Sequence, residues 1–344
     1  FAWWSRGIGY VYKIQQVLDE FVFGKPKVGP TLYHIDRQRT DPLPPPWPDL
    51  ILTSGRRPAN VAMWIREQSG GHTKIIFIGK PSSMPEDYDL IIYSAEHQFP
   101  PLPNLQPITL PLMRVDEAQV TAAANEWEAR LADLPRPLTA FLVGGPTGPF
   151  LFNARAAHRL QSIIRQVIEE TGGTAYITTS RRTPPAVVEA LQSDLPGAAR
   201  LFTWSTDASD NPYRALLGLA DGFVVTGDSI SMMVEVVRLR KPLAILGLPV
   251  GVLGAFDQLR RSLTRWLFAP RCRGPLDRLR QAAGRVLYRM RILTHTRDFV
   301  AFHNMLVTKG LAVHAGEPLR APTAGVPDDL AIAVQRIEAL VRNS

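Results

Sequence analysis

The sequence predicts an α/β protein in which helices flank parallel sheets, divided between two domains. Short apolar runs typical of buried strands alternate along the chain with longer amphipathic runs typical of helices, an order that favours parallel sheets with their loops on one edge. The chain has 344 residues, of which 45% are hydrophobic. Because this length exceeds one ordinary core, two domains of roughly 150 residues are expected.

The amino-terminal half begins this alternation after a proline-rich connection at residues 40–48. Its expected elements are a strand at 49–53, a helix at 58–68, strands at 74–78 and 90–93, and a helix at 116–131. The LPRP segment at 134–137 then marks a stiff linker, since its prolines end the helix. The first domain is therefore placed at 1–135.

The carboxyl-terminal half repeats the same alternation. Its expected strands lie at 139–143, 174–179, 223–225 and 243–246, each pair separated by a helical pattern or a longer connection. A second domain of this β-α-β type is placed at 136–325. A terminal helix within 326–344 is expected to pack back on the first domain.

Three polar turns follow three of these strands and contain the candidate binding residues. Hydroxyls, guanidinium groups and the free N-H groups of helix starts together suit a diphosphate, and the carboxyl ends of parallel strands bring such turns to one edge. The alternative is that the arginines are solvated and the glycines only shape the turns. The residues are Gly144, Gly145, Ser180, Arg181, Arg182, Thr183, Thr226, Gly227, Asp228 and Ser229.

A helix expected after the last of these turns carries an isolated carboxylate, Glu235. It lies among apolar residues, where an ionised group needs a hydrogen-bonding partner. Sugar or ribose hydroxyls are one such partner. The structural alternative is that Glu235 faces solvent or pairs with Arg238, Arg240 or Lys241. Ser231 and Met232, in the first turn of the same helix, complete the set of predicted binding residues.

Composition excludes several kinds of site. The single cysteine, Cys272, excludes an intrachain disulfide framework and a cysteine-rich zinc site, and no cluster of His, Cys and carboxylate residues suggests another metal site. The uncharged apolar stretch at 242–256 is too short and too rich in proline and glycine to span a bilayer. A cytoplasmic protein is expected.

The positive charge, +8 overall, is concentrated near the carboxyl terminus. Residues 260–297 contain eleven arginines and a single acidic residue, Asp277. Within this segment, apolar residues recur at spacings of three and four over 276–293, which predicts a basic amphipathic helix. This helix would bind an anionic membrane surface or a phosphorylated partner. The alternative is that its apolar side docks on the core and its arginines lie at the edges. Nucleic acid is not expected, because stacking aromatics are not interleaved.

One acid-base pair lies at the end of a strand in the first half. Glu96 and His97 follow the expected strand at 90–93, and either side chain could act as a general base toward an acceptor hydroxyl. The alternative is a helix cap followed by a surface histidine.

Several motifs together resemble the mitochondrial-fission ELM family, whose members are similar to glycosyltransferases of the GT-B fold. They are the GG pair after the first strand of the second half, TTSRRTP at 178–184, NPY at 211–213 and VVTGDSISM leading to Glu235. The resemblance is strongest over 139–250. It implies two Rossmann-like domains facing a central cleft, a nucleotide diphosphate-sugar held by the second domain, and Glu235 bound to ribose or sugar hydroxyls.

Three functions follow from these observations. The first is a metal-independent glycosyltransferase that needs no cofactor and uses a nucleotide diphosphate-sugar, with an acceptor at the inner face of the membrane. The second is an adaptor on the same fold that has lost catalysis and recruits a protein partner at a membrane. The third, an NADP-dependent oxidoreductase that binds a 2′-phosphate through Arg181 and Arg182, is disfavoured because GGPTGP departs from G-x-G-x-x-G.

Overall fold

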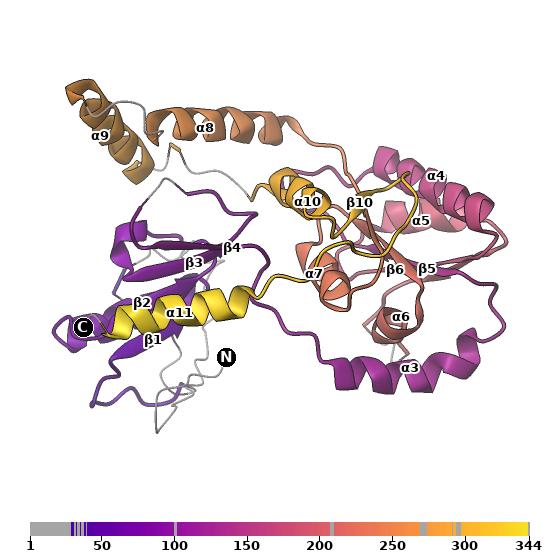
Figure 1. Ribbon diagram of the computed structural model, residues 1–344, viewed down its shortest axis with the longest axis horizontal. Coiled ribbons are helices and arrows are strands. Elements are labelled where there is room, and N and C mark those ends of the chain that lie inside the picture. Colours follow the sequence, from indigo (N-terminus) through magenta and orange to yellow (C-terminus); the bar gives the residue numbers. More distant parts are fainter. Residues whose placement is uncertain are drawn as a thin grey trace. The chain divides into compact units, whose positions relative to one another are not determined.

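A computed structural model describes residues 29–30, 32, 35, 38, 40–99, 102–206, 210–268, 274–290, 292–293 and 297–342. The chain forms two compact units, each built around a parallel sheet (Figure 1). The amino-terminal unit comprises Phe1–Pro111 together with Asp328–Ser344, and the carboxyl-terminal unit comprises Leu112–Pro327. The predicted α/β fold class is confirmed.

The amino-terminal unit contains a four-stranded parallel sheet in the order β1-β2-β3-β4. The strands are β1 (Leu50–Thr53), β2 (Lys74–Ile78), β3 (Leu90–Ser94) and β4 (Leu105–Ile108), and the helices are α2 (Arg56–Gln68), the short 3-10 helix η1 (Pro85–Asp87) and α11 (Asp329–Arg342). Its interior is aliphatic, since Ile75, Ile76, Ile91 and Ile92 are all fully buried. The strands predicted at 49–53, 74–78 and 90–93 form the first three positions of this sheet.

Helix α11 returns to the amino-terminal unit through a buried carboxylate. The side chain of Asp329 accepts hydrogen bonds from the backbone N-H of Thr109 at 2.6 Å and of Leu110 at 2.8 Å, just beyond β4. Asp329 is 1% exposed. At the other end of the helix, Lys74 donates to the carbonyl of Leu340 at 3.4 Å. The helix is thus attached at both ends to the unit to which it belongs.

Replacing Asp329 by alanine is expected to lower the free energy of unfolding by about 2 kcal/mol, because two buried N-H groups lose their acceptor. Urea unfolding measures the change. Asp328→Ala is the matched control: this exposed neighbour caps the same helix by accepting from Ala331 N-H at 3.0 Å, and its loss should cost about 1 kcal/mol. Equal losses in the two variants would contradict the role assigned to the Asp329 carboxylate.

The carboxyl-terminal unit contains a six-stranded parallel sheet in the order β10-β9-β8-β5-β6-β7. The strands are β5 (Leu138–Val143), β6 (Thr174–Thr179), β7 (Ala199–Phe202), β8 (Gly222–Thr226), β9 (Leu243–Leu246) and β10 (Val313–His314). The chain starts at β5, moves outward to β7, and then returns to place β8 on the other side of β5. This is the strand order of the Rossmann fold, with its switch point between β5 and β8.

The carboxyl-terminal unit also contains a set of helices. They are α3 (Glu117–Leu131), α4 (Ala154–Thr171), α5 (Pro185–Ser193), α6 (Tyr213–Leu219), α7 (Ile230–Arg238), α8 (Val252–Phe268), α9 (Pro275–Arg289) and α10 (Phe299–Thr308). The apolar stripe of α4 packs on Phe141 and Ile177 of the sheet. The helix begins at the Asn153 cap and ends at Gly172, whose φ of 65° favours glycine. Each helix in the described part of the chain is too short or too polar to cross a bilayer.

Helix α3 lies in the carboxyl-terminal unit, although the sequence analysis places it at the end of the first domain. It packs along α6 so closely that a Cβ on Gly218 would stand 2.8 Å from the Cβ of Ala124. Arg130 also pairs with Asp210 at 2.6 Å. The boundary between the units therefore falls at Pro111 and Leu112 instead of near residue 135. Sequence periodicity predicted the helix, but it could not predict the unit against which the helix packs.

Candidate functional site

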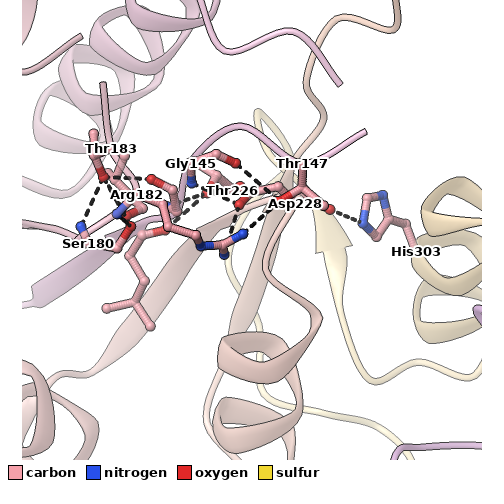
Figure 2. A network of polar contacts seen from close by, with 12 residues as sticks. Gly145, Thr147, Ser180, Arg182, Thr183, Thr226, Asp228 and His303 are labelled. Atoms are coloured by element: carbon pink, nitrogen blue, oxygen red, sulfur yellow. Dashed lines mark hydrogen bonds and ion pairs between the residues drawn. The ribbon is translucent and has the colours of Figure 1, made fainter. Parts of the chain in front are cut away.

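The three polar turns meet at the carboxyl edge of the sheet in the carboxyl-terminal unit. The glycine turn at 144–148 follows β5, the SRRT turn at 180–183 follows β6, and the TGDS turn at 226–229 follows β8 (Figure 2). Two of them flank the switch point between β5 and β8, where ligands of open α/β sheets bind. The structure therefore brings together the turns that the sequence analysis singled out.

Asp228 lies at the centre of this network. Its side chain is fully buried and accepts from Gly145 N-H at 2.9 Å and from the Thr226 hydroxyl at 2.7 Å. A guanidinium nitrogen of Arg182 stands 3.6 Å from the same carboxylate. Burial raises the pKa of Asp228, while these hydrogen bonds and Arg182 oppose that shift. The carboxylate thus ties the three turns together.

The two glycines of the first turn are required by close packing. A Cβ on Gly144 would stand 2.2 Å from Asp228 Oδ2, and one on Gly145 would stand 2.2 Å from the carbonyl oxygen of Arg182. Their N-H groups donate to Thr226 at 2.8 Å and to Asp228 at 2.9 Å. Both N-H groups already donate within the network, so they are not available to a ligand. The glycines therefore shape the site, and an anion would be bound by the arginines and the start of α7.

The SRRT turn is fastened to the glycine turn and presents two arginines. The hydroxyl of Thr183 donates to the carbonyl of Gly144 at 2.6 Å and accepts from Ser180 N-H at 2.9 Å. Arg182 donates to the Thr147 hydroxyl at 2.7 Å, yet 48% of its side chain remains exposed. Arg181 is exposed as well. Two guanidinium groups are therefore available beside the switch point.

Helix α7 begins directly after the TGDS turn and opens toward the same edge. Its N-cap residue, Ser229, makes no side-chain cap hydrogen bond. Ser231 is exposed and Met232 is half-buried in the first turn of the helix. The first N-H groups of a helix carry partial positive charge, so this end and the two arginines form a site suited to an anion.

Glu235 lies one turn further along α7 and is paired with a phenol. Tyr213, the first residue of α6, donates its hydroxyl proton to Glu235 Oε2. Burial and the neighbouring carboxylate raise the pKa of Tyr213 well above its usual value. Lys241, one of the expected alternative partners, instead donates to the carbonyls of Gly218 and Ala220. Sequence reasoning missed Tyr213, although it belongs to the NPY motif.

His303 of α10 is a second residue that sequence reasoning did not place in the site. Its Nε2 lies 2.8 Å from the carbonyl oxygen of Gly227, and its ring stacks on Phe150 with centroids 6.2 Å apart. Burial lowers the pKa of His303 to about 4, so at neutral pH the imidazole is uncharged and Nε2-H donates to the carbonyl. The TGDS turn is thereby attached to α10.

Glu96 and His97 lie in the amino-terminal unit just after β3. Their side chains are 6% and 8% exposed, and His97 Nε2 stands 3.7 Å from Glu96 Oε1. The expected alternative of a surface histidine after a helix cap is wrong, because the histidine is buried and no helix follows over residues 98–99 and 102–104. Among the described residues, Glu96 Oε2 has no hydrogen-bond partner.

Metal ligation has no candidate in the part of the chain that the structure describes, where no three His, Cys, Asp or Glu side chains group together. Apart from the pair at residues 96 and 97, the candidate residues all lie in the carboxyl-terminal unit. The three turns meet at one edge, where some of the predicted residues hold the turns together and others, such as Arg181 and Ser231, are exposed.

Comparison with solved structures finds glycosyltransferases. The chain is similar to a glycosyltransferase from Rickettsia africae ESF-5, with a TM-score of 0.39 and 10% identity, covering 86% of this chain and 78% of the other. It is also similar to ADP-heptose LPS heptosyltransferase II of E. coli, with a TM-score of 0.31 and 15% identity, covering 53% and 63%. These likenesses are loose, and the fold assignment rests on the strand orders of the two sheets.

Comparison of sequences finds closer relatives. The chain is 27% identical over 222 residues to mitochondrial fission protein ELM1 of Arabidopsis thaliana, covering 58% of this chain and 52% of the relative. It is 26% identical over 237 residues to the uncharacterised protein RP120 of Rickettsia prowazekii (strain Madrid E), covering 60% and 65%. The chain thus spans between half and two thirds of these relatives. The model of the mitochondrial fission ELM1 family matches residues 10–290, which confirms the resemblance carried by the motifs, and the chain belongs to that family.

Proposed function

We propose that the protein is a glycosyltransferase that binds a nucleotide diphosphate-sugar at the switch point of the carboxyl-terminal unit. The observation that carries the proposal is the meeting of the SRRT turn, the TGDS turn and the uncapped start of α7 on one edge. A diphosphate needs several donors and positive charge at one place, and this edge supplies guanidinium groups together with helix N-H groups.

The charges of the site would also serve the reaction. When a sugar leaves a nucleotide diphosphate, negative charge develops on the diphosphate, and fixed positive groups aimed at it lower the barrier. Arg181, Arg182 and the start of α7 would take this part, so the proposed mechanism needs no metal ion and no other cofactor. Thr147 and Asp228 would hold the Arg182 side chain in place, and the exposed part of its guanidinium group would contact the donor.

Glu235 would bind hydroxyls of the ribose or the sugar. Its Oε2 accepts from Tyr213, and the same bond orients the carboxylate so that Oε1 can accept from a ligand. Tyr213 would thus be a positioning residue for Glu235.

Glu96 and His97 would act on the acceptor side. As an interacting pair they could take the proton of an acceptor hydroxyl. Because both side chains are buried, this step requires the surrounding segment to open. The acceptor is proposed to lie at the inner face of a membrane, to which the basic helix over 276–293 would bring the protein from the cytoplasm.

The second candidate function is an adaptor on the same fold that binds a protein partner at a membrane and transfers no sugar. The burial of Glu96 and His97 favours it, and so does the name of the Arabidopsis relative, a mitochondrial fission protein. The adaptor would keep the folded turns but would not hydrolyse or transfer a donor.

A panel of nucleoside diphosphates and their sugars, measured by thermal shift and confirmed by calorimetry, tests the proposal. A ligand that binds the native state raises the melting temperature in proportion to the logarithm of its concentration over its dissociation constant. Stabilisation by one nucleoside diphosphate, followed by release of that diphosphate from its sugar in the presence of membrane extract, supports the transferase. Binding without turnover favours the adaptor, and no binding by any diphosphate contradicts both the donor site and the transferase.

Glu235→Gln is expected to weaken binding of the stabilising nucleotide by about 1 kcal/mol, since it replaces a charged acceptor with a neutral one. Tyr213→Phe should weaken it less, because the carboxylate remains but loses its orienting partner. Calorimetry and melting temperature are measured on the same samples. Tyr176→Phe, a half-buried tyrosine on β6, is the matched control. If both site variants lower the melting temperature and leave affinity unchanged, the pair is structural.

A further inference from the structure

Helix α8 has its apolar face turned outward. Five large apolar residues recur at spacings of four and three and are all exposed, with Phe256 at 58% and Trp266 at 49%. Val252, Leu259 and Leu263 complete this stripe. An amphipathic helix of a globular protein normally turns such a stripe toward the core. The polarity of α8 is therefore reversed.

The inward face of α8 is polar at Asp257, Arg261 and Thr264, whereas Leu267 and Phe268 at the end of the helix are buried against α9. Asp257, Arg261 and Thr264 are between 4% and 6% exposed. Arg261 stands 3.5 Å from the carboxylate of Asp298 and donates to the carbonyl of Arg297 at 3.1 Å, at the start of α10. Because these polar contacts fix one face of the helix against the unit, they hold the apolar stripe on the outside.

Helix α9 repeats this reversal. Leu276, Leu279, Val286 and Met290 are exposed, with Leu276 at 81%. Gly284 and Tyr288 face inward instead, and a Cβ on Gly284 would stand 3.2 Å from Leu267 and Phe268 of α8. The alternative of a core-docked helix is therefore wrong for these four residues, whereas Leu293 of the same predicted line is buried.

A small polar cluster joins the two helices into a hairpin, visible as the neighbouring pair α8 and α9 in Figure 1. Arg280 pairs with Asp277 at 3.0 Å, donates to the carbonyl of Trp266 at 2.8 Å, and lies 5.7 Å from the centroid of the Trp266 ring. Each helix thus supports the other while both stripes stay exposed. We name residues 252–268 and 274–290 the basic hairpin.

The exposed charges of the basic hairpin are positive. The sequence over 252–268 and 274–290 contains seven arginines against two aspartates and no glutamate or lysine. Both aspartates, Asp257 and Asp277, are paired with arginines of their own helix. Arg265, Arg278 and Arg285 are exposed. Arg271 and Arg273 lie outside the described residues.

We infer that the basic hairpin is a docking surface for an anionic lipid bilayer. Exposed leucine, phenylalanine and tryptophan side chains would enter the boundary between headgroups and acyl chains, while the arginines would contact lipid phosphates and carboxylates. A second copy of the chain fits less well, since two arginine-rich surfaces would repel one another. This surface uses no residue of the proposed donor site, so its test can fail or succeed independently of nucleotide binding.

Flotation of the full chain with vesicles tests the inference. The protein is expected to float with vesicles of phosphatidylcholine mixed with phosphatidylglycerol at low salt, and to float much less with phosphatidylcholine alone. Raising the salt should release most of it, because exposed charges are screened over about 8 Å at physiological ionic strength. If the protein remains at the bottom of the gradient with anionic vesicles at low salt, the inference is overturned.

Charge and apolar variants separate the two contributions. Replacing Arg265, Arg278 and Arg285 together by glutamine should reduce the vesicle partition coefficient about 100-fold. The matched control removes the same charge from three exposed arginines elsewhere in the carboxyl-terminal unit, Arg155, Arg159 and Arg320, and should change it far less. Phe256→Ser combined with Leu279→Ser should reduce partitioning about tenfold or more while the melting temperature holds.

Two outcomes would overturn the inference even if the protein floats. One is equal loss of flotation in the hairpin triple variant and the control triple variant, which would indicate attraction by net charge alone. The other is a concentration-dependent dimer in light scattering that Phe256→Ser with Leu279→Ser dissociates, which would identify a second copy as the occupant. Nucleotide affinity should be unchanged in every hairpin variant.

Discussion

Replacing Arg181 and Arg182 together by alanine is expected to weaken binding of a nucleoside diphosphate by roughly 2 to 5 kcal/mol, because two charge-assisted contacts are removed. The two arginines differ in what else they do. Arg182 is bonded to Thr147 and stands beside the buried Asp228, whereas Arg181 is exposed. Arg181→Ala should therefore reduce affinity with little change in melting temperature. Arg182→Ala should reduce both, since the buried carboxylate loses its cation.

Titration calorimetry on each single variant and on the double variant decides this prediction. Arg159→Ala is the control, because this exposed arginine lies on α4 of the same unit and its removal lowers the net charge by the same amount. Circular dichroism must show that the double variant is folded. If the folded double variant binds the nucleoside diphosphate as tightly as the wild type, the diphosphate does not bind at this turn and the role of Arg182 is only structural.

Sequence periodicity was sufficient for the central strands of both sheets. The strands at 139–143, 174–179, 223–225 and 243–246 are short apolar runs bounded by turn residues, and the structure has β5, β6, β8 and β9 at these places. A short apolar run of this kind, bounded by turn residues, is typical of a strand that is buried on both faces of a parallel sheet. Their carboxyl ends then place the three polar turns together, which is why most of the candidate site could be predicted.

The edge strands β4, β7 and β10 could not be predicted in the same way, whereas β1, which also lies at an edge, was predicted. β4 includes Pro107, β7 is mostly half-exposed, and β10 contains only Val313 and His314. Such segments have neither length nor a continuous apolar pattern, and they become strands because a neighbouring strand offers free hydrogen-bonding groups. This information lies in the tertiary structure and not in the segment itself.

Residues that act through contacts between distant elements were missed for a related reason. Tyr213 reaches Glu235 only because the start of α6 approaches α7, and His303 reaches Gly227 only because α10 approaches the turn that follows β8. The basic hairpin shows a further limit of prediction from sequence. The spacing of Leu276 and Leu279 establishes that α9 has an apolar face, but the spacing alone does not determine whether that face is turned inward or outward.

Stability of the carboxyl-terminal unit is expected to fall as the pH decreases from 6.5 to about 4, because of His303. Burial lowers the pKa of this imidazole in the folded state, so within that range the unfolded chain binds a proton that the folded chain does not. Stability therefore decreases as the pH falls, by about 3 kcal/mol over the whole range, and does not decrease further below it. Asp298 opposes the shift and His314 adds to it.

The difference in unfolding free energy between the wild type and His303→Gln isolates this group, since other titrating residues contribute equally to both proteins. Asp228 is one of them, and its raised pKa has the opposite effect on stability. Glutamine keeps a donor for the carbonyl of Gly227 but cannot be protonated. The wild-type advantage should shrink with a slope approaching 1.4 kcal/mol per pH unit. A difference that stays constant across this range would show that the folded protein accommodates the imidazolium, and hence that the contact between α10 and the TGDS turn does not depend on a neutral His303.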